Sequence, residues 1–359
     1  NSTEKSTFTF KYCSVTQHIH ILIIRLSAMG DVAMAVPVIR ALVDQYPNVQ
    51  ITVVSKPFLK PLFSGIRNVY FFAADVKKKH RGILGLLQLF RELRIKKITH
   101  VADFHDVLRS KVLRTLFQMI GTPVISIDKG RSEKKALTRS TNKVLKPLKN
   151  SHQRYADVLS ALGFSTDLSD PKPIQRKPLS NKLISITGKK ARQWVGIAPF
   201  AAFKGKIYPI HLMEKVIVSL ASKGFQLFLF GGGQKEIEQL NALEKKYDNV
   251  LNTAGKFSFE EELQLISSLD LMISMDSGNA HLSAMQQVKT ITLWGVTHPY
   301  AGFAPFDQPA DFCLLSNLEK YPKIPCSVYG NKIADGYENA MESISPKTVI
   351  DKVLLVLNS

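Results

Sequence analysis

Short apolar runs alternate with helical repeats along the chain from residue 20 onward. Residues 20–26 form a continuous β-branched apolar run, and residues 32–46 carry apolar side chains at helical spacing, with Pro37 among them. Residues 51–54 form the next apolar run. A continuous apolar run is typical of a strand covered on both faces, and a 3.6-residue repeat is typical of an amphipathic helix. The chain is therefore predicted to open as strand, loop, helix and strand, with the helix kinked or beginning near Pro37.

The same alternation continues through the first half of the chain and restarts in the second. Further strands are predicted at residues 68–72, 97–102, 194–198, 225–230, 271–275 and 290–294. Further helices are predicted at residues 83–95, 107–120, 210–224, 236–246, 258–268, 282–287 and 346–357. Alternating strands and helices are typical of doubly wound parallel sheets. We therefore predict an α/β protein with two Rossmann-like domains that face each other across a central cleft.

Changes in composition mark the predicted domain boundaries. Residues 165–193 hold three prolines among Ser, Lys and Asp and have no sustained repeat, which is typical of a linker. The N-terminal domain is assigned to residues 18–170, the linker to 171–190, the C-terminal domain to 191–345 and a terminal helix to 346–359. Residues 1–17 are polar, and we interpret them as a disordered arm or a remnant of the expression vector.

Positive charge is concentrated in the first half of the chain. The net charge is +19; residues 1–175 hold 28 Lys and Arg against 12 acids, whereas residues 176–359 hold 20 against 17. This asymmetry indicates an acidic partner for the first half: nucleic acid, an anionic membrane surface or a phosphorylated substrate. A solvated basic surface would account for the run at residues 77–81 equally well. Residues 129–154 are the best candidate for the anion-binding surface.

Several protein classes are disfavoured by the sequence. No apolar run approaches the roughly 18 residues that a membrane span requires. The cysteines Cys13, Cys313 and Cys326 do not suggest a disulfide framework and fit a reducing, cytoplasmic location. The loop after the first strand lacks the Gly-x-Gly-x-x-Gly pattern of a dinucleotide dehydrogenase. The basic residues are not interleaved with aromatic ones, so we expect no nucleic-acid partner.

Three predicted turns at strand ends carry residues suited to chemistry. Residues 276–282 (Asp-Ser-Gly-Asn-Ala-His-Leu) follow a strand and precede a helix, where free N–H groups and the helix dipole favour an anion. An Asp cap followed by a turn glycine explains the same pattern. Asp31 stands alone in the turn after the first strand. His105 follows the strand at 97–102, and there a structural hydrogen bond competes with a chemical role.

Two segments resemble the signature motifs of a known family. Residues 21–32 (ILIIRLSAMGDV), continued at residues 37–42, look like the opening motif of glycosyltransferase family 9, which contains the ADP-heptose:lipopolysaccharide heptosyltransferases. Residues 273–282 (ISMDSGNAHL), with residues 293–299 (LWGVTHP), look like its second signature. The resemblance extends from about residue 18 to residue 357. It implies a GT-B fold with the acceptor on the first domain, the nucleotide-sugar on the second, and a last helix that crosses back to the first.

The resemblance also implies an activity. It implies an inverting glycosyltransferase that needs no cofactor or catalytic metal and moves heptose from ADP-heptose onto a lipopolysaccharide inner core of the lipid A–Kdo type. The implied partners are the nucleotide-sugar donor, an anionic lipid-linked glycan acceptor and the inner face of the inner membrane, on which a cytoplasmic enzyme would be peripheral. The alternatives are a different donor or surface-glycan acceptor within the family, and a GT-B-fold sugar-nucleotide epimerase.

The family's functional residues are carried over position by position. Its proposed general base falls on Asp31, its donor-phosphate lysine on Lys206 and its nucleotide-contacting acid on Glu236. Its donor-binding turn falls on Asp276, Ser277, Gly278 and His281. We further assign acceptor or anion binding to Ser27, Met29, Gly30, His105, Arg109 and Lys111.

The chain departs from the family pattern at two places. Hydroxyl residues are common a few positions before the lysine, where this chain has Ala201 and Ala202. Many members carry a cysteine cluster near the C-terminus, where this chain has Cys326 and the distant Cys313. Two thiols without further ligands make no zinc site, so we predict no metal there.

Overall fold

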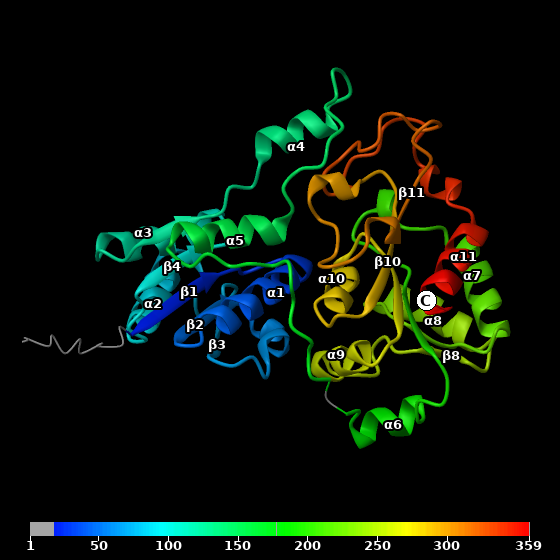
Figure 1. Cartoon of the computed structure of the whole chain (residues 1–359), viewed down its shortest axis with the longest axis horizontal. Helices are drawn as coiled ribbons and strands as arrows, with labels where there is room; N and C mark the ends of the chain where they lie inside the picture. Colours follow the sequence, from blue (N-terminus) through cyan, green and yellow to red (C-terminus); the bar gives the residue numbers. More distant parts are fainter. Residues whose placement is uncertain (1–17, 177, 359) are drawn as a thin grey trace, which may run out of the picture.

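Two separate parallel sheets, each flanked by helices, make up the computed structural model, which describes residues 18–176 and 178–358 (Figure 1). The predicted arm at residues 1–17 lies outside the described residues. The N-terminal sheet has the order β3-β2-β1-β4-β5, and the C-terminal sheet has the order β11-β10-β9-β6-β7-β8. All neighbouring strands are parallel, so the loops that follow the strands gather at one edge of each sheet.

The N-terminal half is built around the buried strand β1. Its strands are β1 (Ile19–Ile24), β2 (Val49–Ser55), β3 (Val69–Ala73), β4 (His100–Asp103) and β5 (Val124–Ser126). Its helices are α1 (Met29–Gln45), η1 (Pro57–Phe63), α2 (Gly82–Arg94), α3 (Leu108–Met119), α4 (Arg131–Thr138) and α5 (Ser151–Ala161). Helices α2 and α3 pack on each other, and α1 packs on α5. The continuous apolar run of β1 is thereby covered on both faces, as its composition predicts.

The C-terminal half repeats this plan with longer connections. Its strands are β6 (Trp194–Ala198), β7 (Gln226–Leu229), β8 (Val250–Asn252), β9 (Leu271–Met275), β10 (Lys289–Trp294) and β11 (Cys313–Leu315). Its helices are α6 (Asn181–Thr187), α7 (Ile210–Ser222), α8 (Gln234–Glu244), α9 (Phe259–Ser267), α10 (Gly278–Ala284) and α11 (Pro346–Asn358), with the short η2 (Lys204–Lys206), η3 (Pro299–Ala301), η4 (Ala310–Phe312) and η5 (Ala340–Ser343). Among the described residues, no helix has the length and apolar character needed to cross a bilayer.

Two helices begin earlier than the sequence pattern predicts. Helix α1 starts at Met29 and contains Pro37 in its interior. The carboxylate of Asp31 accepts a hydrogen bond from the backbone N–H of Ala28 (3.1 Å), which caps the helix start. Helix α10 starts at Gly278, four residues before the predicted position. The predicted turn that carries Asp31 and the predicted turn at residues 276–282 therefore both include the first turn of a helix.

The family resemblance implied that the last helix crosses to the N-terminal domain, but in the structure it stays with the C-terminal half. Helix α11 packs against α7, and its buried Val349, Val353 and Val356 join the apolar core beneath the C-terminal sheet. Lys352 pairs with Asp311 of the same half (2.9 Å). The apolar stripe of α11 is thus satisfied within the C-terminal half. A second difference is that α6 lies inside the segment predicted to be linker.

The two halves meet where the first turns of α1 and α10 pack against each other. Residues of both helices belong to one buried apolar cluster that includes Val32, Val36 and Leu282. The guanidinium of Arg40 donates a hydrogen bond to the carbonyl of Met285 across this interface (2.8 Å). The interface therefore joins the carboxyl-terminal edges of both sheets.

A second contact lies above the first in Figure 1, where residues 143–151, the interdomain strap, run between α4 and α5. The backbone N–H of Leu148 donates to the carbonyl of Tyr300 (3.0 Å), and that of Ser151 donates to the carbonyl of Gly302 (2.9 Å). The ammonium of Lys143 donates to the carbonyl of Pro325 (2.8 Å). This strap and the interdomain linker attach the halves at two separate places.

Candidate active site

Asp31 lies in the first turn of α1, at the carboxyl end of β1, with its side chain partly exposed. Its Oδ2 atom is 2.7 Å from a guanidinium nitrogen of the buried Arg25 and accepts the N–H of Ala28. Arg25 is itself held by the carbonyl of Phe104 (2.7 Å). Within the described chain, Oδ1 has no hydrogen-bond or ion-pair partner. The carboxylate is therefore fixed through one oxygen and leaves the other for a substrate.

Further cations surround this carboxylate, and they come from the basic segment at 129–154. Burial, followed by the charge of Arg154, lowers the pKa of Lys134 to about 8, while Asp31 acts in the opposite direction. The Lys134 ammonium lies 4.4 Å from the centre of the Phe303 ring, a contact that favours the cation. Burial and then Arg25 also lower the pKa of Lys129. These cations make the side of the cleft around Asp31 suited to an anionic group.

The predicted acceptor residues are only partly brought together. Met29 and Gly30 lie in the first turn of α1 beside Asp31, and Ser27 lies in the loop just before it. His105 is buried, and its Nδ1 accepts the N–H of Leu26 (3.4 Å). Burial, with a smaller contribution from Arg25, lowers the pKa of His105 to about 3. The imidazole is therefore neutral at physiological pH, and this hydrogen bond is structural.

Arg109 and Lys111 lie on α3 with exposed side chains. Lys111 is 3.7 Å from Asp106, and neither residue contacts Asp31 through any bond found between the described residues. Their assignment to acceptor binding stays a prediction.

On the C-terminal side, Lys206 and Asp276 form a buried pair. Their Nζ and Oδ2 atoms are 3.0 Å apart, and the hydroxyl of Thr297 donates to the same carboxylate oxygen (2.9 Å). The methylenes of Lys206 run against Gly330, where a Cβ would approach them to 2.4 Å. Asp276 therefore acts as the anchor of Lys206, which points its ammonium toward the turn after β9.

That turn meets the start of α1. A Cβ on Gly278 would lie 2.8 Å from Cε of Met29, and a Cβ on Gly30 would lie 3.0 Å from Cδ2 of His281. The Ser277 hydroxyl lies 3.1 Å from that of Ser274. His281 is buried, and burial lowers its pKa. Close packing of small residues thus brings the Ser277 turn and the first turn of α1 into contact.

A cavity of about 290 Å³ opens beside this contact. It is lined by Met29, Phe200, Ala201, Ala202, Phe230, Gly231, Gly232, Glu236, Phe259, Glu262, Ser277, Gly278 and Asn279. The carboxylate of Glu236 accepts a hydrogen bond from the backbone N–H of Gly232 (2.8 Å). This bond fixes the carboxylate in the first turn of α8. Ala201 and Ala202, at which the chain departs from the pattern implied by the resemblance, form part of the wall. The cavity combines three aromatic rings with two acids and a polar turn.

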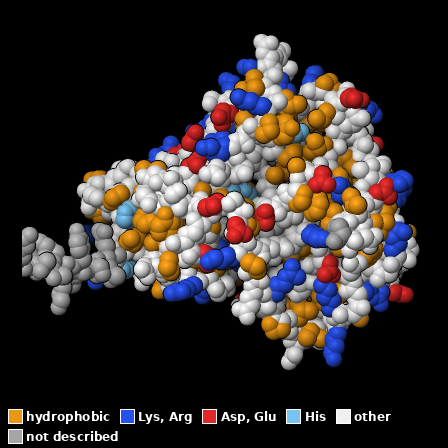
Figure 2. Space-filling view, in the orientation of Figure 1, with side chains coloured by type: hydrophobic (Ala, Val, Ile, Leu, Met, Phe, Trp, Pro, Cys, Tyr) orange, Lys and Arg blue, Asp and Glu red, His pale blue; other side chains and the backbone are white. Residues whose placement is uncertain are grey.

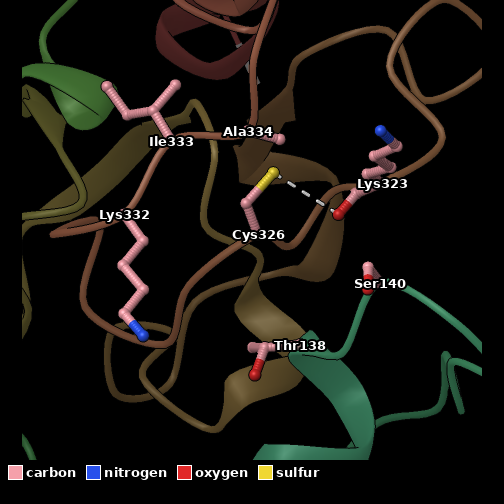
Figure 3. Close-up of a pocket in the computed structure, with 7 residues that line it drawn as sticks. All are labelled: Thr138, Ser140, Lys323, Cys326, Lys332, Ile333 and Ala334. Carbon is pink, nitrogen blue, oxygen red and sulfur yellow. Dashed lines mark hydrogen bonds between the residues drawn. The ribbon is translucent and has the colours of Figure 1, made fainter.

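A second cavity, of about 120 Å³, lies at the far side of the strap (Figure 3). Thr138 and Ser140 face Cys326 and Lys332 across it, and the Cys326 thiol contacts the carbonyl of Lys323 (3.4 Å). Burial raises the pKa of the Cys326 thiol. In the part of the chain that the structure describes, no group of three or more His, Cys, Asp or Glu is arranged to hold a metal ion.

Sequence reasoning missed several residues of the site. Arg25 was read as part of a strand, although a single Arg inside an apolar run is itself a signal that a buried acid is near. Lys134 was identified only as part of a basic segment. Glu262 was recognised only as part of the predicted helix at residues 258–268, because the three consecutive acids at 260–262 give no clue to which one lines a cavity.

The chain is similar to known proteins over most of its length. A family model described as glycosyltransferase family 9 (heptosyltransferase) matches residues 86–333. Lipooligosaccharide heptosyltransferase 2 of Haemophilus influenzae is 25% identical, with 93% of this chain and 98% of that protein covered. The lipopolysaccharide core heptosyltransferase OpsX of the same species is 24% identical, with 78% and 80% covered.

Solved structures resemble the chain over nearly its whole length. A glycosyl transferase family 9 protein from Veillonella parvula aligns with a TM-score of 0.73 at 20% identity, covering 95% of this chain and 98% of the other. Heptosyltransferase WaaC of E. coli, solved with ADP, aligns with a TM-score of 0.66 at 18% identity, covering 94% and 100%. These likenesses confirm the predicted GT-B fold, and the family match confirms the predicted glycosyltransferase.

Gly295→Ala should displace Lys206. A Cβ at residue 295 would lie 2.1 Å from the carbonyl oxygen of Gly205, which immediately precedes Lys206. Because that neighbour is backbone, we expect the free energy of unfolding to fall by about 2 kcal/mol or more, measured by urea denaturation. Gly232→Ala is the control, since no atom lies within 4 Å of its added Cβ. Equal stability of the two variants would contradict this account.

Glu262→Gln should change the pH dependence of stability. Burial raises the pKa of Glu262 from 4.5 to about 7, so the folded protein binds this proton more tightly than the unfolded chain. Stability from this group is then present below pH 4.5 and lost as the pH rises to 7. The variant's stability relative to wild type should increase from pH 5 to pH 8 by up to about 3 kcal/mol. Urea denaturation at both pH values measures it, and a pH-independent difference would contradict it.

Proposed function

The chain belongs to glycosyltransferase family 9, and from that premise we propose that it is an inverting enzyme that moves heptose from ADP-heptose onto a lipopolysaccharide inner core. One observation carries the proposal. The carboxylate of Asp31 and the Ser277 turn come from different domains and meet through Gly30 and Gly278. A single-step inversion needs one base on the acceptor side and a stabilised leaving group on the other.

In this mechanism Asp31 is the general base. Its Oδ1 removes the proton of the acceptor hydroxyl, whose oxygen forms a bond to the anomeric carbon while the bond from that carbon to the phosphate oxygen breaks. Arg25 holds Oδ2 (2.7 Å) and so keeps the carboxylate aimed. Because one carboxylate at the reacting centre provides no covalent intermediate, the product has the inverted configuration.

The leaving ADP gains charge as the bond breaks. Lys206, oriented by Asp276, supplies a positive charge to the departing phosphate, and the backbone amides around Ser277 and Gly278 add hydrogen bonds. Glu236 lies at the other side of the cavity, where its carboxylate can accept a hydrogen bond from a ribose hydroxyl. His281 packs beneath the turn and keeps its contact with α1.

An anionic glycan acceptor fits the other side of the cleft. Lys129 and Lys134 are drawn close to Asp31 with part of their hydration lost. A phosphate or carboxylate on the acceptor would neutralise this charge and restore hydrogen bonds to both ammonium groups. The relatives named above are a lipooligosaccharide heptosyltransferase and a lipopolysaccharide core heptosyltransferase. Their names support an acceptor of this class.

Contact with an anionic membrane follows if the acceptor is lipid-linked. Leu84 of α2 (82% exposed) and Leu108 of α3 (79%) stand at helix starts, on the same edge of the sheet as Asp31. The exposed Lys77, Lys78 and Arg81 flank them. Apolar tips surrounded by cations are typical of proteins that bind anionic bilayers reversibly. Figure 2 shows apolar side chains also at the left-hand end of this domain, away from the cleft.

Asp31→Asn tests the mechanism. We expect turnover to fall about 10²- to 10⁴-fold, because the amide cannot accept the acceptor proton, while affinity for ADP stays within about twofold. Transfer assays and calorimetry measure the two quantities. Asp44→Asn, at the opposite end of the same helix, is the matched control and should leave turnover unchanged. An active Asp31→Asn enzyme would remove Asp31 from the mechanism, and donor consumption without any acceptor would indicate the epimerase alternative.

Leu84→Ser combined with Leu108→Ser tests the membrane surface. We expect binding to vesicles of phosphatidylglycerol and phosphatidylcholine to weaken about 5- to 30-fold in flotation assays, because two leucines no longer enter the bilayer. The matched control replaces Ile95 (81% exposed) and Met119 (78%) with Ser at the opposite edge of the same sheet. Weakening by the control alone would place the membrane at that edge and contradict the assignment.

A further inference from the structure

One acid in the large cavity has no part in the mechanism above. Glu262 lies in the first half of α9, lines the cavity and is half-buried. Its neighbour Glu261 is occupied outside, by Ser258 and by Lys182. For Glu262, by contrast, residues 18–176 and 178–358 offer its carboxyl no hydrogen bond and no ion pair. A half-buried carboxyl with no protein partner has lost part of its hydration without compensation, and a ligand in the cavity can supply the missing donor.

Glu262 lies on the same face of its helix as an aromatic side chain. Phe259 lies three residues earlier, hence on the same face of α9, and it also lines the cavity. Phe58 of η1 in the N-terminal half lies against Phe259, with ring centres 6.3 Å apart. Phe200 and Phe230 line the same cavity. A flat aromatic ligand stacked on Phe259 would have its edge within reach of the Glu262 carboxyl.

Electrostatics decide which part of a nucleotide-sugar this acid faces. A carboxylate beside the diphosphate would repel it, because two negative charges would then lie close together in a partly desolvated site. The diphosphate is instead suited to the turn at Ser277 and to Lys206. The ribose is matched by Glu236, next to Gly231 and Gly232. The aromatic region with Glu262 remains, and its chemistry fits a base that carries an N–H donor.

We propose that Glu262 determines nucleobase specificity by accepting a hydrogen bond from the exocyclic amino group of the donor's adenine, which is stacked on Phe259. This inference rests on the proposed function, because it takes the cavity to be the donor site. A base with a carbonyl oxygen or only hydrogen at that position leaves the carboxyl unpaired, and a carbonyl oxygen also repels it. The raised pKa of Glu262, caused by burial to a value of about 7, agrees with an acid that lacks a partner until the ligand is bound.

A cycle of two proteins and two ligands tests the inference. The ligands are ADP and purine riboside 5′-diphosphate, which differ only in the 6-amino group, and the proteins are wild type and Glu262→Ala. Calorimetry measures the four dissociation constants. We expect wild type to prefer ADP by roughly tenfold or more and Glu262→Ala to show a preference below about twofold. Glu262→Gln, which keeps a carbonyl acceptor, should retain most of the preference.

Controls separate this inference from its premise. Glu260→Ala changes an acid two residues away that does not line the cavity and should keep the wild-type preference. Thermal unfolding of each variant reports whether it is folded. If wild type binds ADP and Glu262→Ala weakens both ligands by the same factor, the role of Glu262 is overturned while the proposed function stands. If wild type binds neither ligand, the cavity is not the donor site, and both the proposed function and the role of Glu262 are overturned.

Discussion

The close approach of two helix starts, α1 and α10, is the constraint on which the site depends. Gly30 and Gly278 permit it, because a Cβ at either position would meet atoms of the other domain within about 3 Å. Asp31 follows the first glycine directly, and Ser277 precedes the second. The distance between the reacting groups is thus set by backbone packing and not by flexible side chains. A rigid approach of this kind provides the orientation that a single displacement step requires.

Each of two acids in the site is paired with a cation, and further cations lie nearby. Asp31 is paired with Arg25, and Asp276 with Lys206. Both cations are largely buried, so their attraction to the acids is weakly screened by solvent. Lys129 and Lys134 add charge that no acid close to them fully balances. The side of the cleft around Asp31 therefore holds several cations close together, which favours an anionic substrate there.

The sequence predicted the parts of the fold that are repetitive and apolar. The strands β1, β6, β9 and β10 lie within two residues of the predicted runs, because a buried parallel strand must be continuously apolar. Short edge strands such as β5 and β8 were missed, since three residues hold no period. Asp31 and the Ser277 turn were predicted through the family motif. Their contact could not be, because it depends on how two distant helices pack.

Side chains whose role depends on a neighbour from elsewhere in the chain escaped prediction for the same reason. Lys134 is one of eleven Lys and Arg between residues 101 and 150, and only the fold shows that it turns inward over Phe303. The last helix was misplaced because its position was inferred from the family resemblance, and an apolar stripe alone does not show which half it covers. In the structure α11 packs on α7, and Val353 belongs to the same buried apolar cluster as the buried residues of α7.

The interdomain strap has a mechanical consequence. Together with the linker that passes α6 on the opposite side of the molecule (Figure 1), it ties the halves at two points that are far apart. Two ties on opposite sides resist sliding and twisting of one half over the other, but leave free a swing about the line that joins them. The motion that these ties permit is therefore a jaw-like opening of the cleft, which would separate α1 from α10 and bring them back to the same contact.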